Sequence, residues 1–114
     1  MNQQKLLHTF YTKADKEMSS ENKENLEIIS SLLRDVSSEK ISVQYFCSHY
    51  ERLFNFKLNK KLLSEYEKKI YNDLFDKVVW YSPFIEERRK IPNYLDESTI
   101  IDSVNKLLNL LNER

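Results

Sequence analysis

Two residues that could act as a nucleophile and a base, Cys47 and His49, stand two positions apart. The chain has one cysteine and two histidines, the second being His8. Side chains at positions i and i+2 of a helix diverge by about 200°, so a helical Cys47 and His49 cannot share a proton or a metal ion. A zinc site also needs more cysteine and histidine ligands than the chain offers. We therefore interpret Cys47 as a buried thiol and His49 as a surface imidazole, and we expect no catalytic residue, no metal ion and no cofactor.

Carboxylates are the next candidates for acid or base chemistry, and most of them have a structural explanation. Asp96 and Glu97 stand where negative charge stabilises the start of a helix. Three further acids precede a lysine by four residues, the favourable order for a helical ion pair: Glu65–Lys69, Asp73–Lys77 and Asp102–Lys106. Solvated helix faces explain these acids better than a hydrolytic pair does.

A cluster of two aspartates and the only tryptophan is harder to explain in this way. On a helix spanning residues 64–81, Asp73, Asp76 and Trp80 fall together, opposite the apolar stripe. Two carboxylates one turn apart repel each other, and an outward tryptophan is typical of a protein-binding surface. The alternative is that the helix ends before Trp80 and the indole packs into the core.

Composition excludes several classes of function. The chain of 114 residues contains no glycine, which the usual phosphate-binding loops require. Its formal net charge is zero, so no overall field favours nucleic acid or a membrane surface. We find neither a signal peptide nor a membrane-spanning segment, and one unpaired cysteine suits a reducing compartment, so we expect a cytoplasmic protein.

Apolar residues keep a helical spacing along nearly the whole chain. We predict an all-α fold, an antiparallel four-helix bundle or a close relative, with an additional short N-terminal helix. Its four main helices are expected at residues 26–36, 43–56, 64–81 and 97–112. Ser42, Ser64 and either Asp96 or Ser98 are expected to cap three of them.

The connections follow from the polar and proline-containing segments. Residues 1–20 are expected to form an N-terminal extension, with a helix over Leu6–Ala14 and a linker over Asp15–Asn25, and residues 21–114 a single helical domain. Pro83 and Pro92 predict an irregular loop over Ser82–Leu95.

The charges are distributed unevenly along the chain. Residues 40–69 carry a balance of +4, whereas residues 70–102 carry −3. An acidic loop beside an exposed aromatic residue suits a basic protein partner. Random scatter in a highly charged chain explains these counts equally well.

A set of short motifs in order resembles the colicin D immunity proteins and related immunity proteins of contact-dependent growth inhibition systems. The motifs are Ile41-Ser42, Phe46, Tyr50, Leu53-Phe54, Asp73-Leu74-Phe75, Tyr81-Ser82-Pro83 and Asp96-Glu97, and the likeness covers residues 26–111. The resemblance implies a small helical inhibitor that occludes the active site of a cognate toxin nuclease, often a tRNase. In that family, carboxylates occupy the basic groove that receives RNA phosphates.

The contact residues that the resemblance implies match this chain only in part. Val79, Ser82 and Phe84 stand where acids of the family stand, and Glu86 matches a nearby family acid better. We predict a partner-binding surface at the end of the 64–81 helix and the following loop, formed by Asp73, Asp76, Trp80, Phe84, Glu86 and Glu87. The expected partner is the toxin nuclease domain, with no direct nucleic acid and no membrane. A helical adaptor or regulatory subunit that docks through Trp80 and neighbouring aromatic residues is the alternative.

Overall fold

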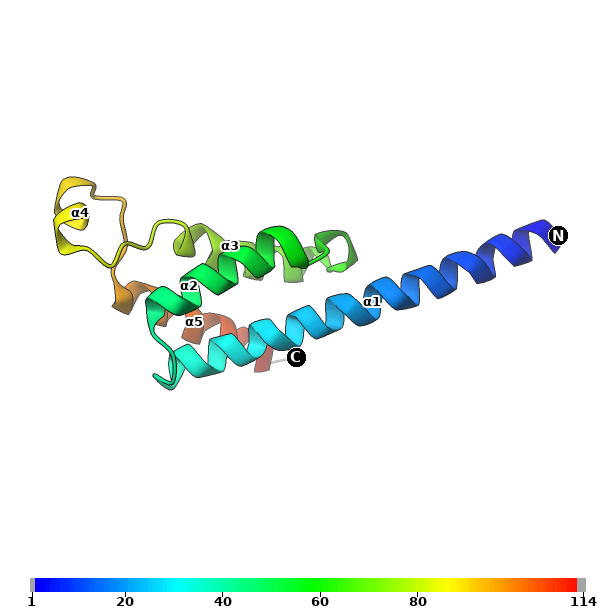
Figure 1. Ribbon diagram of the computed structural model, residues 1–114, viewed down its shortest axis with the longest axis horizontal. Helices are drawn as coiled ribbons and strands as arrows, with labels where there is room; N and C mark the ends of the chain where they lie inside the picture. Colours follow the sequence, from blue (N-terminus) through cyan, green and yellow to red (C-terminus); the bar gives the residue numbers. More distant parts are fainter. Residues whose placement is uncertain (1, 113–114) are drawn as a thin grey trace.

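The chain is all-α, as predicted (Figure 1). The computed structural model describes the backbone of residues 2–112 and the side chains of residues 20–112. Along that backbone the order of elements is α1 (Asn2–Ser37), α2 (Val43–Arg52), the π-helix η1 (Leu53–Lys57), the 3₁₀-helix η2 (Lys60–Leu62), α3 (Glu65–Val78), α4 (Ile85–Lys90) and α5 (Glu97–Asn112). No helix in the described part of the chain is both long and apolar enough to cross a lipid bilayer.

The predicted caps set the starts of three helices. Ser42 accepts a hydrogen bond from the Tyr45 N–H at 3.0 Å. Ser64 and Glu67 form a reciprocal capping box, which satisfies two N–H groups at the start of α3. At α5, Asp96 rather than Ser98 is the cap, since Asp96 Oδ1 accepts the Thr99 N–H at 3.0 Å.

Helix α1 runs unbroken through Asp15–Asn25, so the predicted linker is wrong. The segment is polar, but it lacks glycine and proline, and polarity alone does not interrupt a helix. Two of its asparagines hold the segment between α2 and α3: Asn22 Oδ1 accepts the Asn59 N–H at 2.8 Å, and Asn25 Nδ2 donates to the Lys57 carbonyl at 3.1 Å. The side chains of the predicted Leu6–Ala14 helix lie outside the described residues.

Helix α1 ends in a Schellman motif without glycine. Glu39 has a φ of 64° and donates its N–H to the Val36 carbonyl, and the Lys40 N–H bonds the Asp35 carbonyl at 2.8 Å. The left-handed conformation is unfavourable for a residue with a Cβ atom. Glu39 therefore carries a local conformational cost that the turn between α1 and α2 imposes.

The core lies among α1, α2, α3 and α5, which contact one another in a closed ring of neighbours. Its largest fully buried side chains come from α1, α2 and α5: Ile29, Leu33, Val36, Phe46, Tyr50, Ile100 and Val104. The Tyr50 hydroxyl donates to the Tyr71 carbonyl at 2.6 Å, which satisfies this buried group. Four helices in mutual contact fit the expected bundle, whose antiparallel geometry stays a prediction.

Helix α2 continues directly into a π-helix, and this places another aromatic residue in the core. The predicted helix reached residue 56, and the chain is helical that far, but it passes into the π-helix η1 at Leu53. Phe54 is buried there and stacks on Tyr50 and Phe75, with ring centroids 6.0 and 4.6 Å away. Lys60 Nζ lies over the Phe54 ring, 4.3 Å from its centre, in a cation–π contact.

Candidate partner-binding site

The segment between α3 and α5 is a loop closed at its base. Tyr81 and Leu95 form an isolated parallel bridge, in which the Leu95 N–H bonds the Trp80 carbonyl at 2.7 Å and the Ser82 N–H bonds the Leu95 carbonyl at 3.1 Å. The predicted irregular loop over Ser82–Leu95 contains the short helix α4, which projects from one end of the molecule (Figure 1). We call residues 81–95 the α4 loop.

Buried polar contacts fix the α4 loop from inside. Ser82 is almost fully buried, and its hydroxyl donates to Glu87 Oε2 at 2.6 Å and accepts the Phe84 N–H at 3.2 Å. Arg88 Nη1 donates to the Ser82 carbonyl at 2.6 Å. Bonds that involve a charged group are stronger than neutral ones, so this network holds the start of α4 against the loop base.

Trp80 lies outside helix α3 and outside the core. The helix ends at Val78, so the alternative in which it stops before Trp80 is right about the backbone. The indole nevertheless keeps 43% of its surface exposed and leans on Tyr94, with ring centroids 5.9 Å apart. The bridge at Tyr81–Leu95 brings Tyr94 to it, and an exposed indole on a fixed backbone is a typical anchor for a partner.

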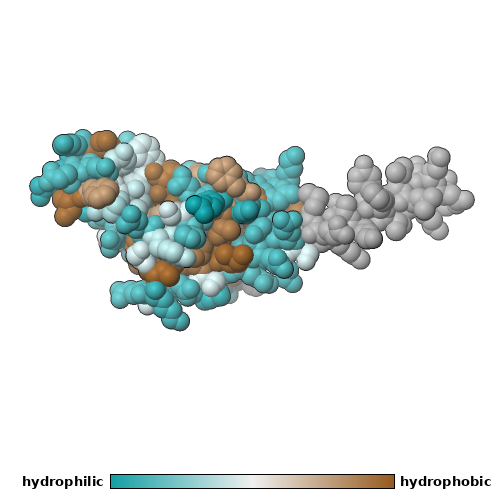
Figure 2. All heavy atoms as spheres, in the orientation of Figure 1, coloured by the Kyte–Doolittle hydropathy of each residue, from teal (hydrophilic) through white to brown (hydrophobic). Residues whose placement is uncertain are grey.

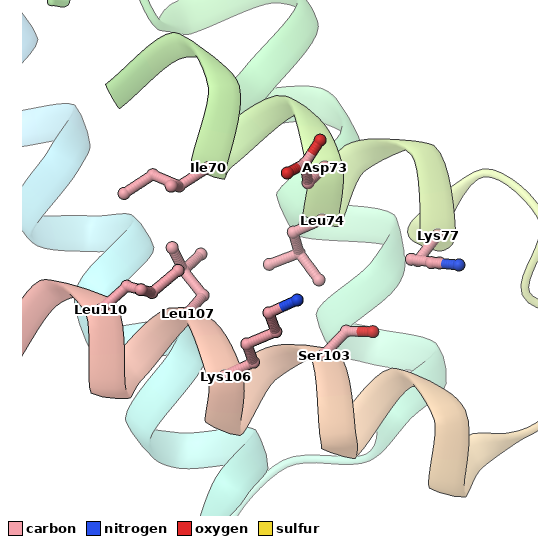
Figure 3. Close-up of a pocket in the computed structure, with 8 residues that line it drawn as sticks. All are labelled: Ile70, Asp73, Leu74, Lys77, Ser103, Lys106, Leu107 and Leu110. Carbon is pink, nitrogen blue, oxygen red and sulfur yellow. The ribbon is translucent and has the colours of Figure 1, made fainter. Parts of the chain in front are cut away.

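The six predicted site residues line three hollows, the first two of which share Lys77. Asp73 lines a small hollow between α3 and α5, of about 90 Å³, beside Lys77 and Lys106. Figure 3 shows Ile70 and Leu74 from α3 meeting Leu107 and Leu110 from α5 at its floor, with Lys106 extending from α5 toward α3. Asp73 remains exposed there, with 62% of its side-chain surface accessible, but it lines the hollow toward α5 and not the one that Asp76 and Trp80 share.

Asp76 and Trp80 do share a surface, as the sequence predicts. They line an open hollow of about 450 Å³ together with Lys77, Asn93 and Leu95. Its walls are therefore the end of α3 and the last residues of the α4 loop. Phe84, Glu86 and Glu87 line the third hollow, at the start of α4, with Pro83 and Ile85.

The α4 loop presents apolar side chains to solvent. Phe84 and Ile85 are more than half exposed, and Ile91 is exposed as well. Val79 and Trp80, which directly precede the loop, are also exposed. Figure 2 shows hydrophobic side chains on the projecting part of the molecule that Figure 1 assigns to α4. Contiguous exposed apolar residues of this kind usually mark an interaction surface.

Most carboxylates of the predicted site have a partner within the chain. Glu87 binds Ser82, Glu86 lies 3.9 Å from the Arg89 guanidinium, and Asp73 lies 3.4 Å from Lys69 Nζ. None of the expected pairs Glu65–Lys69, Asp73–Lys77 and Asp102–Lys106 is among the ion pairs of residues 20–112, where Glu65 pairs with Lys68 and Asp73 with Lys69. Among residues 20–112, Asp76 has only a long contact of 3.5 Å with the Asn72 amide. It is the carboxylate of the set most available to a partner.

Cys47 is buried as predicted, whereas His49 is half-buried and not the surface imidazole expected. Cys47 is buried, and burial raises the pKa of its thiol to about 12, with Glu51 adding to the shift. His49 stacks on Tyr45 at 4.0 Å, and its Nδ1 lies 3.0 Å from the Tyr45 carbonyl. Among residues whose side chains are described, no three metal-binding groups gather.

Sequence reasoning missed four residues of this region. Ile85 stands beside Phe84 at the start of a charged helix, and that apolar pair was a visible signal. Tyr94 and Asn93 reach the Trp80 surface only because the bridge folds the α4 loop back, and no local pattern reports such a contact. Lys77 lies on α3 beside Asp76 and was within reach of the helical pattern.

Comparison of the chain with protein-family models, with curated proteins and with solved structures yields no match.

Proposed function

We propose that this protein is a cytoplasmic immunity protein that neutralises a cognate bacterial toxin nuclease, an RNase or tRNase, by stoichiometric occlusion of its active site. On this proposal the chain has no catalytic activity of its own and binds neither nucleic acid nor a membrane. The observation that carries the proposal is that Trp80 and Asp76 line one hollow beside the α4 loop, whose apolar side chains are exposed.

Three features support tight binding through a surface that is already ordered in the free chain. The α4 loop is fixed by its base bridge and by the Ser82 network, so ordering it costs little on binding. Trp80 and Phe84 offer aromatic anchors, and the resemblance described above points to the same end of the molecule.

The proposal predicts that a toxin nuclease domain is encoded beside this chain, and titration of that domain tests it. Cleavage of tRNA should fall linearly with added protein and vanish at a 1:1 ratio, and co-expression should protect cells from this toxin and not from unrelated ones. Protection at amounts far below the toxin indicates catalysis and contradicts the proposal.

The second candidate is a helical adaptor or regulatory subunit without a toxin. The internal engagement of Glu86 and Glu87 favours it, because these carboxylates are less able to replace phosphates in a basic groove. The adaptor binds through Trp80, Phe84 and Ile85, and its affinity changes little between 50 and 500 mM salt. An immunity complex led by carboxylates weakens over the same range.

A further inference from the structure

The hollow beside Trp80 combines three kinds of side chain that can bind a ligand together. It offers an exposed indole, the Asp76 carboxylate and the Asn93 amide, arranged around a space of about 450 Å³. Asp76 makes no ion pair among residues 20–112, and its contact with Asn72 is long. An aromatic face beside an available carboxylate is the chemistry that recognises an organic cation.

We propose that this hollow binds an arginine side chain of the protein partner, with the guanidinium stacked on Trp80 and paired to Asp76. The proposal deepens the proposed function and rests on it for the identity of the partner. Arginine fits better than lysine because its planar group stacks on an indole and still donates sideways to a carboxylate. Asn93 adds an amide oxygen within the same walls.

The walls of the hollow are held in place before any partner arrives. The Trp80 N–H bonds the Lys77 carbonyl at 3.1 Å, and the Trp80 carbonyl accepts the Leu95 N–H at 2.7 Å. Tyr94 supports the indole from one side. A stacked guanidinium therefore meets an indole whose backbone is already fixed.

Lys77 supplies the sharpest test because it lines the same hollow with a positive charge. A bound guanidinium is repelled by Lys77, whereas a bound carboxylate is attracted to it. Replacing this lysine therefore changes affinity in opposite directions for the two kinds of occupant.

The experiment uses the full chain and small probes rather than the toxin. Trp80 is the only tryptophan, so its indole N–H gives one resonance that reports on this hollow alone. N-acetyl-arginine amide should shift that resonance saturably, with a Kd on the order of millimolar. N-acetyl-citrulline amide, which has the same shape without the charge, should bind at least about five-fold more weakly.

Three variants complete the test. Asp76→Asn should lower the affinity for the arginine probe about two- to five-fold, and Lys77→Met should raise that affinity by a similar factor. Asp102→Asn removes the same charge from α5, lines none of the hollows described above, and should leave the affinity unchanged. Equal binding of citrulline, weaker binding by Lys77→Met, or an indole resonance that does not move would overturn the proposal.

The probe titration and the toxin titration fail independently. A chain that inhibits its toxin 1:1 but ignores the arginine probe keeps the proposed function and loses this inference. A chain that binds the probe but inhibits no toxin keeps the arginine site and loses the immunity proposal.

Discussion

The Ser82 hydroxyl donates a hydrogen bond to Glu87 Oε2 at 2.6 Å, across the turn that starts α4. The contact has two consequences. It ties the projecting helix to the buried base of its loop, and it engages one of the two adjacent acids that the sequence offers as partner contacts. The α4 loop is therefore better described as a fixed apolar projection with few available carboxylates than as an acidic surface.

Replacing Ser82 should loosen this projection. In Ser82→Ala, Glu87 and the Phe84 N–H lose a buried partner, and the free energy of unfolding should fall by about 1–3 kcal/mol. Urea denaturation measures the loss. Ser48→Ala on the exposed face of α2 is the matched control and should change stability by less than about 0.5 kcal/mol. Equal stability of the two variants would show that the Ser82 network does not hold the loop.

Glycine at position 39 should stabilise the protein. Glu39 adopts a φ of 64° at the end of α1, and glycine adopts this conformation without the clash of a Cβ atom. Glu39→Gly should raise the free energy of unfolding by about 1 kcal/mol in thermal or urea denaturation. Glu39→Ala keeps the Cβ atom and should bring no such gain, so equal gains in the two variants would contradict this explanation.

The Cys47 thiol should be unreactive in the folded protein. Its pKa is raised to about 12, so the nucleophilic thiolate is scarce at neutral pH, and a thiol-specific chromogenic reagent should react only after unfolding in urea. The unfolded thiol ionises from about pH 9, its ordinary value, while the folded one stays protonated. Stability should therefore fall as the pH rises from 9 toward 12, and Cys47→Ser should reduce that slope. Burial raises the pKa of Tyr50 as well, which adds to the loss above pH 10.

Local chemistry predicted much of the fold. Ser42, Ser64 and Asp96 cap helices where the sequence places them, because a cap depends on residues within one turn. Of the apolar stripe predicted on the 64–81 helix, Ile70, Tyr71, Leu74 and Val78 are buried and Phe75 is partly buried, whereas Tyr66 is exposed. The boundary that failed is Asp15–Asn25, where polarity was interpreted as a break although nothing in the segment breaks a helix.

The candidate site depended on contacts that local patterns cannot report. The helical spacing of residues 64–81 predicted that Asp76 and Trp80 lie together, and they do line one hollow, although helix α3 ends at Val78. The prediction also included Asp73, which remains exposed but lines the hollow between α3 and α5 instead. The bridge between Tyr81 and Leu95 joins residues 14 positions apart. It brings Tyr94 against Trp80 and closes the loop that contains the short helix α4, and no local pattern predicts either contact.

The central claim is that Trp80 and the α4 loop form the partner-binding surface, and calorimetric titration with the toxin domain tests it most directly. Trp80→Ala and the double variant Asp76→Ala, Glu86→Ala are measured against the parent chain. Phe56→Ala on η1 removes another exposed aromatic ring, at a distance from the α4 loop in sequence and fold, and serves as the control.

Trp80→Ala should weaken binding by about 2 kcal/mol or more, roughly 30-fold in Kd, while its melting temperature stays near that of the parent, because the indole is exposed. The double variant should lose about 2–5 kcal/mol if its acids are desolvated in the complex, mainly through faster dissociation. Phe56→Ala should bind as the parent does. Undiminished affinity in Trp80→Ala and in the double variant would contradict the account and move the interface elsewhere, first to the basic segment at Lys57–Lys61.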